Sequence, residues 1–402
     1  MIKKIKNNSK PYATYTDRVI AFAKAFQNEV APIFKDYEVY RLQEFNKHKP
    51  EFILLILGGI VSLLLLIIPI IYKNLVLFFI CFVINGIFYY YVVEKYCKYI
   101  HKKNKEFQNS LKRVAFKNCT NCFGDIEWEN YGIYDRAYSF LDYNFKASGL
   151  FSDYNLKATD DVFTGTYKGI SYKITETTMI YRLVIQESNF DFKVFKGIII
   201  EFECNKKIKN RTIVSTKGDL TTKNKSWYTI LTSCLIATIF ALPTLLPIFF
   251  ENIRFIILLL FAIIISTIMI STLRFEINKM VDKELRLDKL KKLELVTLES
   301  PEFNKKFNVY SSDQVEARYL VTTSFMERFQ NLKTHFGAKK AKCSFYDGNK
   351  IMFAIHTDKD LFELGDLYHP LLDSNSHNDL FETLNSIFDM IEYFKLDEKT
   401  GL

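Results

Sequence analysis

Four long stretches of the chain contain no charged side chain and consist mainly of apolar residues. They span Phe52–Tyr72, Leu75–Val93, Tyr228–Phe250 and Phe255–Leu273. An α-helix rises about 1.5 Å per residue, so roughly 20 apolar residues are enough to cross the ~30 Å hydrocarbon layer of a bilayer. Only a short turn separates the two stretches of each pair. The pattern therefore predicts four transmembrane helices in two hairpins.

Positive charge gathers beside these stretches in a chain whose formal net charge is +9. The flanking segments 95–105 and 279–292 are rich in Lys and Arg, whereas the two turns hold only Lys73 and Arg254. Because Lys and Arg resist export, we expect both turns outside and both termini in the cytoplasm. This predicts a multi-pass protein of the cell inner membrane. Its basic segments are expected to attract anionic lipid headgroups rather than nucleic acid.

Two further features agree with that location. Residues 1–49 lack a short apolar core followed by a small-residue cleavage site, so no signal peptide is predicted. The seven cysteines are odd in number and scattered, and Cys81 and Cys234 lie within apolar stretches. Reduced thiols in the cytoplasm are therefore expected.

The spacing of apolar residues elsewhere predicts both helices and strands. Helices are expected over 12–49, with a break at Pro32, over 313–332 and 380–394, and as basic stalks after the second and fourth apolar stretches. Strands are expected within 163–176, 194–204, 211–215, 307–310, 343–346 and 350–355. Gly197 is a candidate bulge position, and Asp347-Gly348 predicts a hairpin turn.

These elements predict five segments along the chain. They are N-terminal cytoplasmic helices (1–51), a transmembrane hairpin (52–93), a cytoplasmic helix with the first half of an α+β domain (94–226), a second hairpin (227–273), and a helical stalk with the second half of that domain (274–402). Neither half holds the balance of strands and covering helices that a core needs. We therefore predict the α+β class: one cytoplasmic antiparallel-sheet-and-helix domain, interrupted by the second hairpin. Two separate small domains are the alternative.

Several motifs occur in a characteristic order. They are Ser148-Gly-Leu-Phe151, Asp161 with Gly165, Val194-Phe-Lys-Gly197, Leu298–Phe303 and Phe307–Thr322. This series resembles a bacterial family of uncharacterised membrane proteins, catalogued as a domain of unknown function and sometimes mislabelled galanin. The similarity covers residues 90–218 and 287–365 and is most specific over 313–318. It implies a bacterial source and a membrane location, and it implies no catalytic residue. The chain departs from the family pattern by its second hairpin.

Cys119 and Cys122 form a CxxC pair, the one formal metal or redox motif in the sequence. Cys97 and His101 stand four residues apart on the preceding predicted helix, so a four-ligand zinc site can be drawn. No second CxxC or HxxxH completes a standard zinc pattern. Ordinary buried or surface thiols are the simpler interpretation, and the sequence leaves metal binding here open.

Histidines and acidic residues gather near the C-terminus. The six histidines are His48, His101, His335, His356, His369 and His377, and the neighbouring acids are Asp358, Asp360, Asp366, Asp373 and Asp379. Carboxylates and imidazoles together can bind a metal, but this spacing matches no known ligand pattern. A polar surface loop is the expected structure.

The charges of Asp313, Glu316 and Arg318 stand at the predicted start of a helix. Asp313 is expected to cap that helix, Glu316 to complete a capping box, and Arg318 to pair with an acid on the sheet. Glu299 and Glu302 receive the same structural interpretation. The sequence contains no phosphate-binding loop and no hydrolase nucleophile motif. We therefore predict no catalytic, cofactor-binding or metal-ligating residue.

The expected function is that of a non-enzymatic membrane protein. Its cytoplasmic domain would bind an unidentified protein partner or lipid headgroups, and no nucleic acid. One alternative is a membrane-associated enzyme whose site forms only on folding, acting on lipid or phosphate esters; it requires perturbed acids that converge on a cleft. A small transporter or channel is less favoured, because the apolar stretches hold no ionisable group.

Overall fold

The protein is described by a computed structural model. The residues described are 14–71, 80–81, 84–87, 90, 94–124, 126–136, 143–151, 154–185, 188–217, 219, 293–371 and 374–394. The chain divides into two compact units. The first unit comprises residues 1–38, 108–222 and 285–402, and the second comprises 39–107 and 223–284.

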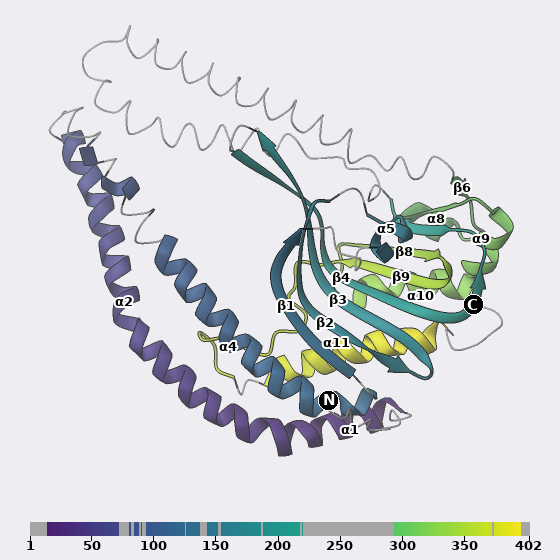
Figure 1. Cartoon of the computed structure of the whole chain (residues 1–402), viewed down its shortest axis with the longest axis horizontal. Helices are drawn as coiled ribbons and strands as arrows, with labels where there is room; N and C mark the ends of the chain where they lie inside the picture. The colour runs from purple at the N-terminus through teal and green to yellow at the C-terminus, as the bar shows by residue number, and fades with distance from the viewer. Residues whose placement is uncertain are drawn as a thin grey trace, which may run out of the picture. The chain divides into compact units, whose positions relative to one another are not determined.

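A nine-stranded antiparallel sheet forms the centre of the first unit. Its strands are β1 (Ile126–Arg136), β2 (Leu156–Tyr167), β3 (Ile170–Ile185), β4 (Ser188–Ile208), β5 (Thr212–Thr216), β6 (Glu294–Val296), β7 (Phe307–Ser311), β8 (Lys340–Tyr346) and β9 (Gly348–His356). Their order across the sheet is β1-β2-β3-β4-β9-β8-β5-β7-β6. Strands β1 to β4 are long and curved (Figure 1).

Strands from both flanks of segment 223–284 share this sheet. Val214 of β5 lies opposite Cys343 of β8 on one side and Val309 of β7 on the other. Ile200 of β4 lies opposite Phe353 of β9. The prediction of an antiparallel sheet with helices, made of both sequence halves, is confirmed for these residues. A division of the strands into two separate small domains is wrong.

The described residues also form helices, and those of the first unit cover both faces of the sheet. The helices are α1 (Tyr15–Ala25), α2 (Ala31–Ile71), α4 (Lys95–Cys119), α5 (Tyr143–Ser148), α8 (Pro301–Lys306), α9 (Gln314–Leu320), α10 (Thr323–His335) and α11 (Ser374–Tyr393), with a π-helical turn at Phe26–Val30 and a 3-10 turn at Thr120–Phe123. Side chains of β9 show the two faces. Phe353 packs toward Phe329 of α10, whereas Met352 joins a cluster with Phe145 of α5. The alternation along a strand sends neighbours to opposite faces.

Two glycines determine local geometry. Asp347 and Gly348 both have positive φ, 49° and 85°, and Tyr346 pairs with Lys350, so the predicted β8–β9 hairpin is confirmed. Gly197 has φ 146°, and a Cβ there would lie 2.1 Å from the carbonyl oxygen of Ile355. Glycine is therefore required for β4 and β9 to approach. The bulge predicted at Gly197 is not found there. The register shift between β3 and β4 lies between Met179 and Ile180 of β3, whereas Gly197 pairs regularly with Thr177.

The helix predicted over 313–332 is two helices. α9 ends at Leu320, and α10 begins at Thr323 after a break. The hydroxyl of Thr322 accepts a hydrogen bond from the backbone N–H of Phe325 at 3.2 Å. Threonine supplies its own helix cap here, which competes with continuation of α9. The predicted break near Pro32 is wrong: α2 begins at Ala31, but the π-helical turn Phe26–Val30 joins it to α1 and the backbone stays helical throughout.

The described residues of the second unit include parts of α2 and α4. The rings of Tyr40 and Phe107 lie 6.0 Å apart, and the hydroxyl of Tyr96 donates to the carbonyl oxygen of His48 at 3.4 Å. Many of the apolar side chains that the structure describes beyond Phe52 in α2 are exposed, and Leu54 is the most exposed of them at 72%.

The prediction of four transmembrane helices is overturned. In the part of the chain that the structure describes, no helix combines the length and apolarity needed to cross a bilayer. The predicted hairpins, the membrane and transmembrane assignment, and the multi-pass inner-membrane location are corrected accordingly. The absence of charged side chains from a stretch describes only the hydropathy of that stretch. In α2 the apolar residues from Phe52 extend a helix that starts at Ala31 and is charged up to Glu51.

Several predicted segments fall outside the described residues. The apolar stretch 75–93 is described only in part, and the stretches 228–250 and 255–273, with the second basic stalk over 279–292, are not described at all. The first basic stalk is helical and belongs to α4. The predicted segment boundaries, the protein partner and the lipid-headgroup partner stay predictions.

Candidate functional site

The C-terminal half of α4 packs over the first strands of the sheet. The ring of Phe116 lies 5.2 Å from that of Trp128 on β1 and 5.0 Å from that of Phe163 on β2. Lys112 stands four residues before Phe116, one turn away on the same side of the helix. This packing places the lysine side chain over β2 in the core, where it is only 1% exposed.

A β-bulge brings two acids of β2 to the same place. Thr159 pairs with Thr177 and Val162 pairs with Thr175, so Asp160 and Asp161 together lie opposite one residue of β3, Glu176. Such bulges redirect side chains and are common beside functional sites. Here Asp161 is fully buried and Asp160 is half-buried.

Lys112 is the buried counter-ion of this group. Its Nζ lies 2.7 Å from Oδ2 of Asp161 and 2.6 Å from Oε1 of Glu363, which belongs to the segment after β9. Burial alone would lower the pKa of Lys112, but the charges of Asp161 and Glu363 outweigh it and hold the pKa above its usual value. The indole Nε1 of Trp128 donates to Oδ1 of Asp161 at 2.8 Å. The lysine is therefore charged and fixed.

Glu176 is the unusual member of the cluster. It is 8% exposed, and its Oε2 is buried without a hydrogen-bond partner. Its carboxylate faces Asp161 and Asp360, and one oxygen from each of the three residues lies within 4.8 Å of the others. Burial, followed by repulsion from Asp360 and Asp161, raises the pKa of Glu176 to about 9. Glu176 is therefore protonated near neutral pH in this structure.

Asp360 also belongs to a second, outer group. Oxygens of Asp160, Asp360 and Glu363 lie within 4.8 Å of one another. Burial is the main cause that raises the pKa of Glu363 to about 7. We call Lys112, Asp160, Asp161, Glu176, Asp360 and Glu363 the acidic cluster. Five carboxyl groups facing one lysine leave an excess of negative charge and of oxygen ligands, which suits a hard cation.

The CxxC pair plays no part in this cluster. Cys119 and Cys122 are buried, and burial raises the pKa of each thiol to about 12. In the described part of the chain, neither joins a group of three or more ligand atoms that could hold a metal. A thiolate is the form that binds zinc or reacts, so these two residues have the character of core thiols.

The histidine- and acid-rich segment is divided by the fold. Asp360 joins the acidic cluster, whereas His369 pairs with Asp366 at 2.9 Å near the surface. His377 stacks on Phe26 with ring centroids 4.4 Å apart. Asp373 lies outside the described residues.

The charges at the start of α9 have structural roles. Asp313 accepts hydrogen bonds from the backbone N–H groups of Val315 and Glu316 at 2.9 and 3.1 Å, so the predicted cap is confirmed. The predicted capping box is wrong. Glu316 instead accepts from the backbone N–H groups of Lys209 and Asn210 at 2.7 and 2.8 Å.

Two other predicted charges also contact backbone or helix ends. Arg318 donates to the carbonyl oxygens of Gln314 and Thr297 rather than to an acid on the sheet. Glu302 lies in the first turn of α8, where Ser300 is the cap. These contacts stabilise the joint between β5, α8 and α9.

Sequence reasoning missed Lys112, Glu176 and Glu363 as members of one site. Two signals were present. The adjacent acids Asp160 and Asp161 interrupt a strand whose buried residues include Val162, Phe163 and Tyr167. A lysine four residues before a buried phenylalanine stands on the apolar side of an amphipathic helix.

The comparison with known families identifies one region. Residues 254–396 match the family described as "Protein of unknown function (DUF3137)". This match is consistent with the uncharacterised family inferred from the motifs. The matched region includes Asp360 and Glu363 but not Lys112, Asp161 or Glu176. No curated protein and no solved structure matches the chain.

Proposed function

We propose that the first unit of this chain is a divalent-cation-binding module, with Asp161, Glu176 and Asp360 as the inner ligands. One observation carries the proposal. The carboxyl group of Glu176 is buried, lacks a partner for Oε2 and faces two further carboxylates.

The energetics favour a cation at this position. A buried polar atom without a partner costs about 1–3 kcal/mol, and a buried unpaired charge costs more. Without a cation, the cluster lowers its charge by keeping a proton on Glu176. A divalent cation would replace that proton and give Oε2 a ligand bond. It would also lessen the repulsion between Asp161 and Asp360.

The donor set selects the class of cation. The ligand atoms are carboxylate oxygens, which hard cations prefer, whereas zinc in structural sites is bound by Cys and His. Ca²⁺ accepts six to eight oxygens in flexible geometry, and Mg²⁺ is usually held by one or two carboxylates with several waters. A cluster of three to five carboxylates therefore favours Ca²⁺.

The site joins three parts of the fold. Asp161 and Glu176 belong to neighbouring strands, Asp360 and Glu363 to the segment after β9, and Lys112 to α4. A bound cation would hold this segment against β2 and β3. This supports a binding role for the unit. The interpretation as an enzyme loses its best sequence candidates, because Asp313, Glu316 and Arg318 make structural contacts.

Calorimetric titration of the full chain with Ca²⁺, after removal of bound metal by a chelator, tests the proposal. We expect saturable binding that is weakened at least about tenfold (~1.4 kcal/mol) by Glu176→Gln. Glu203→Gln, an exposed change on β4, serves as the matched control and should bind as the wild type does. Equal binding by the wild type and Glu176→Gln, or no binding of Ca²⁺ and Mg²⁺ at millimolar concentration, would refute the proposal.

A further inference from the structure

A cavity of about 420 Å³ lies between α10 and α11, and the acidic cluster contributes no residue to it. Its apolar wall consists of Leu332, Phe336 and Met390, which are all buried. Arg328 and Glu392 contribute opposite charges to the lining. The volume falls within the range of small-molecule sites, which are mainly apolar with a few placed polar groups.

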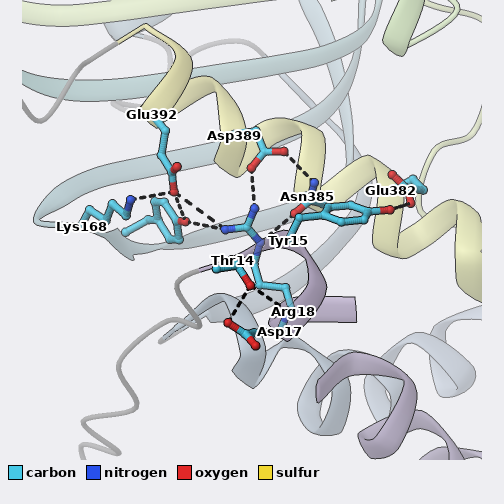
Figure 2. Close-up of polar contacts among 10 residues, drawn as sticks. Thr14, Tyr15, Asp17, Arg18, Lys168, Glu382, Asn385, Asp389 and Glu392 are labelled. Carbon is cyan, nitrogen blue, oxygen red and sulfur yellow. Dashed lines mark hydrogen bonds and ion pairs between the residues drawn. The ribbon is translucent and has the colours of Figure 1, made fainter. Parts of the chain in front are cut away.

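Three side chains hold one carboxylate oxygen of Glu392 in place. Its Oε1 lies 2.8 Å from Nζ of Lys168, accepts a hydrogen bond from the hydroxyl of Tyr167 at 2.7 Å, and lies 3.8 Å from Nη1 of Arg18. Figure 2 shows Lys168 and Arg18 converging on Glu392 at the end of α11. No described residue donates to Oε2 of Glu392. Oε1 of Glu392 is thus fixed by three partners, and within the described part of the chain Oε2 remains an acceptor at the cavity wall.

Both oxygens of the neighbouring Asp389 already have a partner. Its Oδ1 lies 2.6 Å from Nη2 of Arg18, and its Oδ2 accepts from the amide of Asn385 at 2.7 Å. Both contacts are drawn in Figure 2. The acceptor for a positively charged ligand group is therefore Glu392 rather than Asp389.

Arg328 offers the complementary charge. A guanidinium presents five N–H donors in a planar fork, so it can bind a ligand carboxylate while keeping another contact. The side chains of Asn331 and Ser386 also line the cavity and have no partner among the described residues. They supply further polar groups around the same apolar wall.

From this arrangement we propose that the cavity binds an α-amino acid with a large apolar side chain. Its ammonium group contacts Oε2 of Glu392, its carboxylate contacts Arg328, and its side chain packs on Leu332, Phe336 and Met390. An amino acid is the small ligand class that joins one cation, one anion and an apolar body within a few bonds. This site extends beyond the cation-binding function and does not depend on it.

Calorimetric titration of the full chain with L-phenylalanine and L-leucine tests the site. We expect saturable binding, and at least tenfold weaker binding of N-acetyl-L-phenylalanine, which lacks the ammonium group, and of L-phenylalanine methyl ester, which lacks the carboxylate. Ser386→Phe should fill the cavity and remove binding. Asn378→Phe places the same ring at an exposed position of α11 and should keep the affinity within about twofold of the wild type.

Two charge variants test the orientation without relying on Ser386→Phe to fold. In Glu392→Gln, the preference for L-phenylalanine over its N-acetyl derivative should disappear. In Arg328→Gln, the preference over the methyl ester should disappear. Absence of saturable binding of either amino acid at millimolar concentration would overturn the proposal. So would unchanged binding by a folded Ser386→Phe, or preferences unaffected by both charge variants.

Discussion

Nζ of Lys112 lies 2.7 Å from Oδ2 of Asp161, and neither side chain is more than 1% exposed. The pair joins α4 to the bulge of β2 inside the core. Buried pairs of this kind contribute little compared with apolar residues of the same volume. Removal of one partner is nevertheless costly, because it leaves an uncompensated buried charge.

We therefore expect Lys112→Met to destabilise the first unit by about 3–5 kcal/mol in chelator-treated protein. Methionine keeps most of the volume but removes the charge that faces Asp161 and Glu363. Chemical denaturation measures the effect. Lys117→Met, an exposed change on the same helix, should alter stability by less than about 0.5 kcal/mol. Similar losses for the two variants would show that the ion pair has no special role.

Stability should fall as the pH rises through the neutral range. The pKa of Glu176 is raised from 4.5 to about 9, so between these values the folded state holds a proton that the unfolded state has lost. The contribution of Glu176 to the free energy of unfolding is complete below pH 4.5. It is lost by up to about 1.4 kcal/mol per pH unit as the pH increases toward 9. Glu363, whose pKa is raised to about 7, acts in the same direction up to that pH.

Denaturation of the wild type and Glu176→Gln in chelator between pH 5 and pH 8 measures this effect. Glutamine does not titrate, so the stability of the variant relative to the wild type should increase with pH. Parallel pH profiles would mean that Glu176 does not keep its proton in the folded protein.

Cation binding should release protons. At pH 7 a bound Ca²⁺ replaces the proton on Glu176, so about one proton should leave for each cation bound. Titrations in buffers with different ionisation enthalpies count the released protons. The number should fall in Glu176→Gln. Uptake of protons by the wild type would contradict the proposed ligand set.

The side chain of Arg18 anchors α1 to α11. It is 3% exposed and donates to Asn385, Tyr167 and Asp389 at 2.8, 3.0 and 2.6 Å (Figure 2). Arg18→Met should cost about 2–3 kcal/mol, less than a fully buried pair, because Asp389 is 42% exposed. Hydrogen exchange of residues 15–25 should become faster. Lys24→Met, an exposed change on the same helix, should leave that exchange rate unchanged.

Gly197 and Gly169 allow a matched test of backbone approach. Both have positive φ, but a Cβ at Gly169 meets no atom within 4 Å, whereas one at Gly197 meets the carbonyl oxygen of Ile355. Gly169→Ala should cost about 1 kcal/mol from conformation alone. Gly197→Ala should cost clearly more, because β4 and β9 must separate. Denaturation midpoints compare the two, and equal losses would exclude a steric effect.

Local signals in the sequence predicted local structure well. Asp347-Gly348 indicated the β8–β9 hairpin, and Asp313 indicated the start of α9, because each acts through its own backbone within a few residues. The break at Thr322 was missed, since apolar spacing continues across it and the side-chain cap decides the outcome.

The candidate site depends on contacts that no local pattern contains. Lys112 and Asp161 are 49 residues apart in sequence, and Glu363 comes from beyond β9. Their meeting follows from the bulge in β2 and from the packing of Phe116, which apolar periodicity does not specify. The transmembrane prediction rested on hydropathy alone, and no helix among the described residues combines the length and apolarity needed to cross a bilayer.

The position of β5 has a consequence for synthesis on the ribosome. Both of its neighbours in the sheet, β7 and β8, are translated later, and the second is complete only at Tyr346. At an elongation rate of ~5–20 residues per second, both edges of β5 (Thr212–Thr216) lack their hydrogen-bond partners for on the order of ten seconds. The nascent chain therefore passes through a stage at which this strand can pair with another polypeptide, and slower elongation between β5 and β8 should increase misassembly.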